Sequence, residues 1–377
     1  MKKVVIIGPA YPLRGGLATF NQRFAKELKL YQIDPIIYTF TLQYPSFFFP
    51  GKTQIDTDQP RNGVDIHAEI NSINPLNWIK VAKEIASLQP DYIICRYWIP
   101  FFGPSLGSIL RLIKKNCDAK IVALVDNLIP HERRFGDQLL TKYFVAPIDY
   151  FLVMSEKVKR DIEAFNIDKP IIRLMHPIFD NYGPKVSRAD ALEHLGLPED
   201  MTYVLFFGFV RKYKGLDLLL NAMTNPILKN SNIKLIVAGE FYEKEGKYRN
   251  MIKLQKLSDK VIMYPDYVPN KEVKYYFSAS DLVVLPYRSA SQSGISQIAF
   301  HYAKPILITD VGGLPEIVDD GHNGFIVEAR PDSIAAGMKQ FLDRKDKCNL
   351  SKYILENNEK FSWSRFTQDL LSQLEVA

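Results

Sequence analysis

The sequence predicts an α/β protein made of two doubly wound parallel sheets in tandem. Its 377 residues are too many for one ordinary hydrophobic core and suit about two domains. Short apolar runs alternate with segments of helical periodicity, which is typical of parallel strands joined by crossover helices. The alternation begins again after a polar stretch at residues 180–200, which we interpret as the linker between two halves.

The first half opens with an apolar run that predicts a buried strand at residues 4–8. A turn with Gly15 and Gly16 then leads to a helical pattern at residues 17–28. The other runs of this half predict strands at residues 35–39, 92–95, 121–125 and 150–154, and helices at residues 78–88 and 106–115.

The second half opens with a strand at residues 203–207, a cationic turn and a helix at residues 216–223. Its other strands are expected at residues 234–238, 261–264, 282–285, 306–309 and 324–327, with helices at residues 271–278 and 296–302. Open α/β sheets bind ligands at the carboxyl ends of their strands, so we expect the site in a cleft between the two sheets.

Composition excludes several classes of protein. Hydrophobic residues make up 47% and charged residues 24%, as in ordinary globular proteins. The net charge of +6 allows an anionic substrate or membrane surface but gives no reason to expect a nucleic acid partner. Cys95, Cys117 and Cys348 are far apart and lack metal spacing, so we expect free thiols in a reducing, cytoplasmic compartment. No run has the length of a transmembrane helix, and the run at residues 4–7 is too short for a signal peptide.

The cationic turn is the most informative motif. Gly208 ends the strand, Arg211 and Lys214 follow, and Gly215 precedes the helix. Backbone N–H groups, the positive end of a helix dipole and two cations would then surround one point, which suits a diphosphate. The alternative is a solvated basic turn. Neither half contains the G-x-G-x-x-G or G-x-x-x-x-G-K-[ST] pattern, which argues against NAD, FAD and P-loop ATPases.

With the two glycine-bearing turns, several later motifs resemble glycosyltransferase family 4. They are Ser-Asp-Leu-Val-Val-Leu-Pro-Tyr at residues 280–287, Ala-Lys-Pro-Ile-Leu-Ile-Thr-Asp-Val-Gly-Gly-Leu-Pro-Glu at 303–316, Gly-His-Asn-Gly-Phe at 321–325 and Phe-Ser-Trp-Ser-Arg-Phe at 361–366. The resemblance covers nearly the whole chain and is more specific in its second half.

This resemblance implies the GT-B fold, with two Rossmann-like domains facing each other across a cleft. Residues 1–180 would bind the acceptor, residues 181–360 would bind the nucleotide sugar, and a helix within residues 361–377 would cross back to the first domain. The implied activity is retaining, metal-independent transfer of a hexosyl group from a UDP- or GDP-sugar to a glycan or lipid-linked acceptor. Surface polysaccharide or glycoconjugate synthesis, at the inner face of the membrane, would be the setting, with no cofactor besides the substrate.

The sequence departs from the family pattern in three places. The two glutamates that usually precede the Lys-Pro motif are replaced by Ala290 and Ile298. The arginine that usually follows the strand glycine is replaced by Phe209, and Arg211 stands two residues later, on the same side if the strand continues. In the first half, Asp126-Asn127 stands where many members have His-Asp. These changes keep a rival hypothesis open, namely a non-catalytic nucleotide-sugar or glycan-binding protein. A GT-B epimerase or phosphorylase has no supporting motif.

The candidate site residues follow from the turn and the resemblance. For catalysis they are Arg211, Lys214 and His131, although a lone histidine is more often structural. For donor binding they are Gly208, Gln292, Ser293, Gly294, Gln297, Gly312, Gly313 and Glu316; the two glutamines and Ser293 would supply neutral hydrogen bonds, and Glu316 could merely cap a helix. For an acceptor or phosphate loop they are Gly15, Gly16 and Asn127. No metal ligands are expected. Aromatic stretches at residues 44–51 and 97–104 would contact acceptor, membrane or core.

Overall fold

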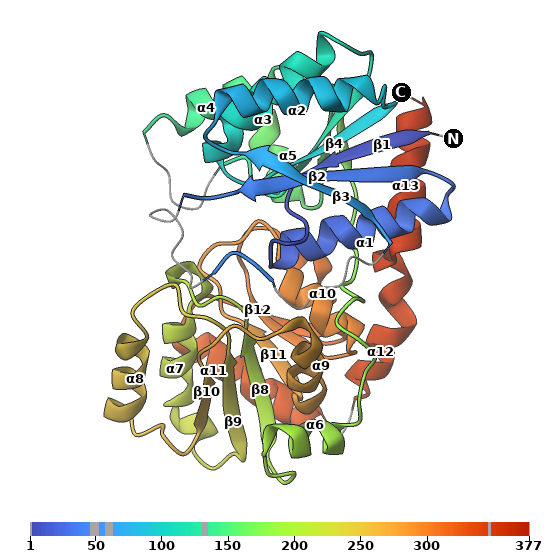
Figure 1. Ribbon diagram of the computed structural model, residues 1–377. Helices are drawn as coiled ribbons and strands as arrows, with labels where there is room; N and C mark the ends of the chain where they lie inside the picture. The colour runs from blue at the N-terminus through green and yellow to red at the C-terminus, as the bar shows by residue number, and fades with distance from the viewer. Residues whose placement is uncertain (1, 46–52, 57–62, 130–134, 346–347, 377) are drawn as a thin grey trace. The chain divides into compact units, whose positions relative to one another are not determined.

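The computed structural model describes residues 2–45, 53–56, 63–129, 135–345 and 348–376. The chain divides into two compact units (Figure 1). Unit 1 comprises Met1–His176 and Trp363–Ala377, and unit 2 comprises Pro177–Ser362. The expected linker at residues 180–200 is wrong, because this stretch belongs to unit 2 and contains helix α6 (Arg188–Leu195). Ser187 caps α6, and its short apolar face carries only Ala191 and Leu192 as buried residues, so the polar composition concealed a helix.

Unit 1 contains a parallel sheet in the order β3-β2-β1-β4-β5-β6-β7. Its strands are β1 (Lys3–Ile7), β2 (Asp34–Leu42), β3 (Asp65–Asn71), β4 (Tyr92–Tyr97), β5 (Lys120–Val125), β6 (Tyr150–Val153) and β7 (Ile171–Arg173). The five predicted strands are present. The sequence did not reveal β3 and β7, which form the two edges of the sheet; β3 is only partly buried and β7 has three residues.

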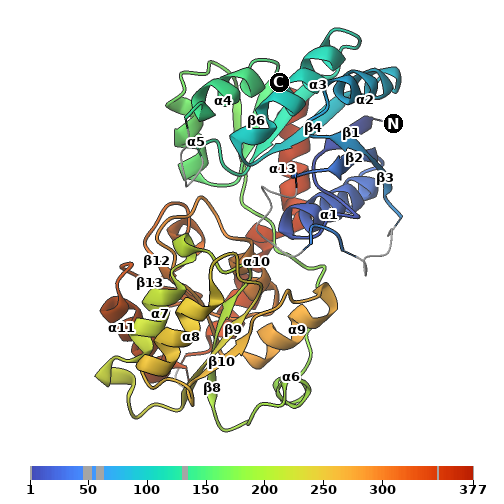
Figure 2. The ribbon, with the colours of Figure 1, turned by 60° about the vertical axis from the view of Figure 1, so that its left-hand side comes forward.

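Helices cover both faces of this sheet. They are α1 (Gly16–Leu30), α2 (Pro75–Ser87), α3 (Gly103–Lys114), α4 (Asp137–Val145), α5 (Glu156–Glu163) and α13 (Trp363–Val376). Helices α2, α3 and α4 lie next to one another, whereas α1 and α13 lie side by side on the other face (Figures 1 and 2). Among the described residues, no helix is both long and apolar enough to cross a membrane.

An aromatic cluster holds α13 against α1. Trp363 and Phe366 are buried, and their rings lie 4.9 Å and 6.0 Å from the ring of Phe20. Phe24 adds an edge-on contact with Phe366 at 5.6 Å. The sequence-distant last helix therefore completes the first unit, as the resemblance implied.

Unit 2 contains a second parallel sheet, in the order β10-β9-β8-β11-β12-β13. The strands are β8 (Thr202–Phe207), β9 (Ile233–Ala238), β10 (Val261–Tyr264), β11 (Leu282–Leu285), β12 (Ile306–Thr309) and β13 (Gly324–Val327), each within two residues of its prediction. The helices after α6 are α7 (Leu216–Met223), α8 (Glu245–Leu254), α9 (Asn270–Ala279), α10 (Gly294–His301), α11 (Pro331–Arg344) and α12 (Leu350–Asn357). Helices α7, α8 and α11 cover one face of the sheet and build its main core (Figure 2).

In both sheets, the direction in which successive strands are added reverses at the first strand. The switch point lies between β1 and β4 in unit 1 and between β8 and β11 in unit 2. Ligands of open α/β sheets bind at such a switch point, outside the carboxyl ends of the strands. The fold therefore puts the Gly15-Gly16 turn and the Gly208–Gly215 turn at these two places.

Replacing Phe366 with alanine should destabilise unit 1 by about 3–5 kcal/mol, because a buried aromatic ring is lost and leaves a cavity. The three tryptophans of the chain, Trp78, Trp98 and Trp363, all lie in unit 1, so their fluorescence during urea unfolding reports on this unit. The matched control is Phe135→Ala, which removes a fully exposed ring and should leave the transition unchanged. Equal midpoints for the two variants would contradict the packing described.

Candidate functional site

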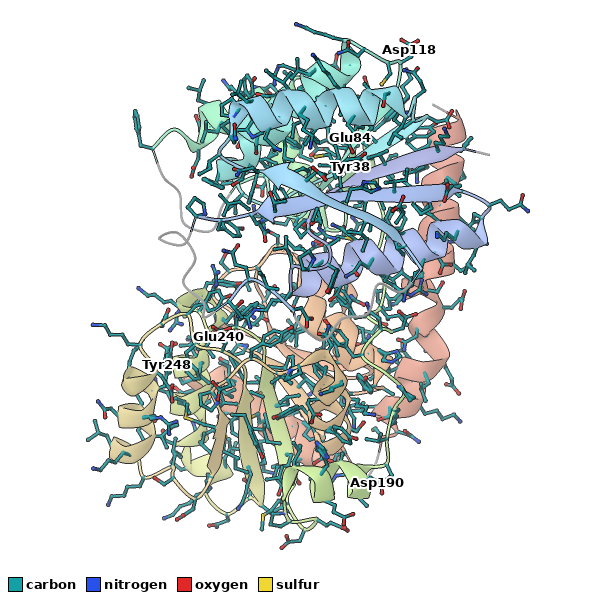
Figure 3. The ribbon with its side chains drawn as sticks, in the orientation of Figure 1. Tyr38, Glu84, Asp118, Asp190, Glu240 and Tyr248 are labelled. Atoms are coloured by element: carbon teal, nitrogen blue, oxygen red, sulfur yellow. The ribbon has the colours of Figure 1, made fainter. Side chains whose placement is uncertain are left out.

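Two neighbouring strands of unit 2 end at glycines with positive φ. Gly208 follows β8 with φ +94°, and Gly239 follows β9 with φ +140°. A methyl group on Gly239 would lie 2.2 Å from the carbonyl oxygen of Gly208, so only glycine permits this approach. Beyond the glycines, the backbone N–H of Val210 donates to the Glu240 carbonyl at 2.9 Å, so the two segments that follow β8 and β9 pair again. Glu240 in Figure 3 marks this extension of the sheet.

The turn that follows is fixed from the next strand. Gly215 has φ +68°, and a methyl group there would lie 1.9 Å from the carbonyl oxygen of Pro286, just after β11. The backbone N–H of Arg288 donates to the Tyr213 carbonyl at 2.7 Å. Its guanidinium donates to the Lys212 carbonyl at 3.0 Å and pairs with Asp217 at 2.7 Å. The Arg288–Asp217 pair therefore fastens the turn to the start of α7.

The side chain of Lys214 points into the protein rather than into solvent. The residue is 8% exposed, and a methyl group on Gly208 would lie 3.2 Å from its Nζ. Burial, with a smaller contribution from the charge of Arg211, lowers the pKa of Lys214 to about 7. Neither Lys214 nor Arg211 has an ion pair or a side-chain hydrogen bond with another described residue. A buried cation without a protein anion is costly, and an anionic ligand would offset this cost.

The amino end of α10 meets the same point. Ile295, in its first turn, lies 3.3 Å from the position of a methyl group on Gly208. Ser293, at the N-cap position, makes no side-chain capping hydrogen bond; its hydroxyl lies 3.4 Å from that of Tyr287. The Tyr287 ring in turn lies 5.7 Å from Lys214 Nζ. The ammonium group and the positive end of a helix dipole are thus brought together around Gly208.

The positions of the two family glutamates are occupied by buried apolar side chains. Ala290 and Ile298 are 4% and 3% exposed. Nearby on α10, Gln297 is 1% exposed, and its Oε1 has no hydrogen-bond partner among the described residues. Gln292 is half-buried. Gly294 packs closely on Phe179, since a methyl group on Gly294 would lie 2.8 Å from the Phe179 ring. These two positions therefore carry no carboxylate, and α10 contributes a buried neutral polar group, the amide of Gln297.

The loop after β12 has a structural reason for its glycines. Gly312 has φ +57°, and a methyl group on it would lie 1.6 Å from the carbonyl oxygen of Ala290. Gly313 is buried beside it. Glu316, expected at the start of a helix, lies half-buried in the short 3-10 turn Pro315–Ile317. Packing against residue 290 therefore explains Gly312 without a ligand.

Unit 1 presents its glycine turn differently. Gly15 is the N-cap of α1 with φ +108°, and, apart from the adjoining residues and the backbone of α1, no described residue has a heavy atom within 4 Å of a methyl group built on Gly15 or Gly16. Asn127 is half-buried just after β5. His131 lies outside the described residues, as do residues 46–51 of the first aromatic stretch. Of the second aromatic stretch, Trp98 and Phe102 belong to the main core of unit 1.

Sequence reasoning missed a buried ionic network at the carboxyl edge of the first sheet. Arg96 donates to both carboxylate oxygens of Asp126, each at 2.7 Å, and to Asn21 Oδ1 at 3.1 Å. Asn21 donates from its amide to the Pro9 carbonyl at 2.8 Å. The network connects β4, the end of β5, α1 and the loop after β1. The available signal was a charged residue inside the apolar run at residues 93–98. No cluster of three or more His, Cys, Asp or Glu within the described ranges is suited to a metal ion.

Residues 187–361 match the family model described as "Glycosyl transferases group 1". This match lies within unit 2. The chain is 27% identical over 274 residues to a D-inositol 3-phosphate glycosyltransferase of Streptomyces avermitilis, covering 67% of this chain and 58% of that protein. It is 26% identical to an uncharacterized glycosyltransferase of Methanocaldococcus jannaschii, covering 100% of this chain and 98% of that protein. The chain spans only 49% to 58% of the length of the D-inositol 3-phosphate glycosyltransferases of three Streptomyces species.

Solved structures of other proteins share the fold. The sucrose-phosphate synthase of Thermosynechococcus elongatus superposes with a TM-score of 0.76 at 15% identity, covering 100% of both chains. The Anabaena protein HepE in complex with UDP-glucose gives a TM-score of 0.76 at 16% identity, covering 99% of this chain and 100% of HepE. The protein therefore has the GT-B fold, with one Rossmann-like sheet in each unit.

The burial of Lys214 predicts an unusual effect on stability. Since its folded pKa, about 7, is below the ordinary value of 10.5, folding is penalised most fully below pH 7 and the penalty disappears as the pH rises towards 10.5. Lys214→Met should therefore raise the free energy of unfolding of unit 2 by roughly 2–5 kcal/mol at about pH 6 and by less at about pH 9.

Urea unfolding followed by circular dichroism at the two pH values measures this gain. Tryptophan fluorescence reports on unit 1 in the same samples and should not change. Destabilisation of unit 2 by Lys214→Met at low pH would mean that the ammonium group has a protein partner.

Proposed function

We propose that the protein is a glycosyltransferase that moves a hexosyl group from a nucleotide-diphosphate sugar to a glycan or lipid-linked acceptor. The observation that carries the proposal is the buried ammonium of Lys214 at the switch point between β8 and β11, which has no anionic partner among the described residues. The family match over residues 187–361 supports glycosyl transfer, and the UDP-glucose complex of HepE, a protein of the same fold, supports a nucleotide-sugar donor.

In the proposed reaction, the bond between the anomeric carbon and the β-phosphate oxygen breaks, and its electron pair goes to the phosphate. Arg211, Lys214 and the amino end of α10 stabilise the negative charge that develops there. Arginine can bind two phosphate oxygens at once, and lysine acts as a point charge. The acceptor oxygen bonds to the anomeric carbon from the same face, so that configuration is retained, and its proton passes to the departing phosphate.

Neutral groups take the place of the family glutamates in this proposal. Gln292, Ser293 and Gln297 hydrogen-bond the hydroxyl groups of the donor, and the buried Oε1 of Gln297, which has no hydrogen-bond partner in the described part of the chain, supports this role. No cofactor is required and no metal ion takes part. The acceptor binds to unit 1, near the open backbone of Gly15 and Gly16 and beside Asn127. The setting is the cytoplasmic side of the membrane, in the synthesis of surface polysaccharides or glycoconjugates.

The apolar replacements favour a second candidate, a protein that binds a nucleotide sugar without turnover. Ala290 and Ile298 are buried where the family has carboxylates, so two groups that contact the donor in relatives are absent. Incubation with a panel of nucleotide sugars separates the two functions. Release of UDP or GDP, even slow hydrolysis, supports the transferase, whereas calorimetric binding with no release supports the binding protein.

Replacing Lys214 with alanine should lower kcat/KM for the donor by about 10²-fold or more, because one preorganised contact to a developing anion is lost. Arg211→Lys should also lower it, since lysine cannot reproduce the guanidinium fork. Steady-state kinetics with the donor found in the panel measures both effects.

The matched control is Lys253→Ala, an exposed lysine on α8, which should keep wild-type kinetics. Wild-type kinetics in a folded Lys214→Ala protein would contradict the proposal that the donor diphosphate binds at this site.

Donor affinity should depend on pH through Lys214. A bound diphosphate favours the protonated amine, whose pKa is otherwise about 7, so binding should weaken as the pH rises above 7. The weakening approaches about tenfold in Kd per pH unit. Calorimetry with a nucleotide sugar between about pH 6 and pH 8.5 tests this, because its diphosphate does not titrate in that range. Lys214→Arg should abolish the dependence, since arginine stays charged; a flat wild-type profile would contradict the proposal.

A further inference from the structure

Arg211 is held differently from Lys214. Lys214 is buried, whereas Arg211 is exposed just beyond the end of β8. Within the described part of the chain, its guanidinium makes no ion pair and no side-chain hydrogen bond. It lies instead over the ring of Tyr242, 4.8 Å from the ring centre. An exposed arginine samples many rotamers, and this contact restricts the side chain of Arg211.

The backbone places the ring and the arginine together. Past the glycines that end β8 and β9, Val210 pairs with Phe241, and the Tyr242 N–H donates to the Val210 carbonyl at 3.0 Å. Arg211 and Tyr242 are the residues that directly follow this bridge, one on each of the two paired segments. Their contact is therefore fixed by the pairing of the sheet extension.

Phe209, on the same segment as Arg211, also packs against the Tyr242 ring. Residues two apart on an extended chain lie on the same side, and the structure agrees, since both Phe209 and Arg211 contact Tyr242. The Phe209 ring lies 4.5 Å from the Tyr242 ring, and Tyr267, after β10, stacks on Phe209 at 6.4 Å. The phenylalanine that replaces the usual arginine thus packs against the ring that holds the displaced arginine.

We propose that Tyr242 is a positioning residue for Arg211 in diphosphate binding. The ring covers one face of the planar guanidinium, whose N–H groups lie in the plane and stay available for phosphate oxygens. Holding the side chain in advance reduces the conformational entropy that is lost when the diphosphate binds. The inference rests on the proposed function, because it requires a diphosphate at Arg211.

The test is calorimetry with UDP and GDP, each compared with its nucleoside, uridine or guanosine. The tighter of the two diphosphates is carried through the variants Tyr242→Leu, Tyr242→Phe and Arg211→Ala and the double variant Tyr242→Leu/Arg211→Ala. We expect Tyr242→Leu to raise Kd for the diphosphate about threefold to tenfold, the range of a partly exposed cation–π contact. Tyr242→Phe keeps the ring and should bind like wild type, and Kd for the nucleoside should not change.

The double variant separates positioning from packing. If Tyr242 acts through Arg211, adding Tyr242→Leu to Arg211→Ala should change Kd no further. An equal loss with and without Arg211, or an equal loss for diphosphate and nucleoside, overturns the inference. So does wild-type diphosphate affinity in Tyr242→Leu while Arg211→Ala weakens it, and that result leaves the proposed function intact. No effect of Arg211→Ala, or no diphosphate binding by wild type, defeats the diphosphate site itself.

Two further proteins keep the result interpretable. Tyr275→Leu makes the same substitution on α9, where the ring stacks on His194 at 3.7 Å, and should leave diphosphate affinity unchanged. Tyr242→Met removes the ring but keeps most of the volume and should reproduce the loss if Tyr242→Leu does not fold.

Discussion

The buried ammonium of Lys214 is the constraint around which the carboxyl edge of the second sheet is arranged. Water does not stabilise this cation fully and no described carboxylate pairs with it, so its position has to be enforced by its surroundings. Gly208 leaves room for the amine, and Gly215 presses the turn against the Pro286 carbonyl. Arg288 then holds the turn through backbone and carboxylate contacts. Rigid support of this kind is expected where binding energy, rather than folding stability, depends on the charge.

The first sheet offers a contrast within the same molecule. Arg96 is also a buried cation near a switch point, but Asp126 and Asn21 satisfy its guanidinium. The two charges of such a buried pair compensate each other, and removal of either partner alone would leave the other charge uncompensated. Through the Asn21 contact with Pro9, it braces the loop that leads to Gly15. The cation of the first sheet therefore has a structural role, and this contrast favours unit 2 over unit 1 for the diphosphate site that we propose.

The sequence predicted the parts of this arrangement that depend on local patterns. Continuous apolar runs located the inner strands of both sheets, because strands buried on both faces have no polar side. The edge strand β3 and the polar helix α6 escaped this reasoning, since tertiary packing rather than periodicity stabilises them. Gly208, Arg211 and Lys214 lie within seven residues and were found together. Arg96 and Asp126 are thirty positions apart, and only the pairing of β4 with β5 brings them together. The contact of Tyr242 with Arg211 could not be predicted from the sequence for the same reason, because it depends on the bridge between Val210 and Phe241.

The absence of carboxylates at positions 290 and 298 is physically connected with the lack of ion pairs that Lys214 and Arg211 show among the described residues. A carboxylate at position 290 or 298 would lie on the same edge of the sheet and would lower the local positive potential. The structure fills both positions with buried apolar groups, and residue 290 is further fixed by the close approach of Gly312. Without those carboxylates, the field at Gly208 comes from Lys214, Arg211 and the amino end of α10. In the function that we propose, this field selects the donor mainly by the negative charge of its diphosphate and less by hydrogen bonds to its sugar. Neutral side chains such as Gln297 agree with that proposal, because they leave this positive potential undiminished.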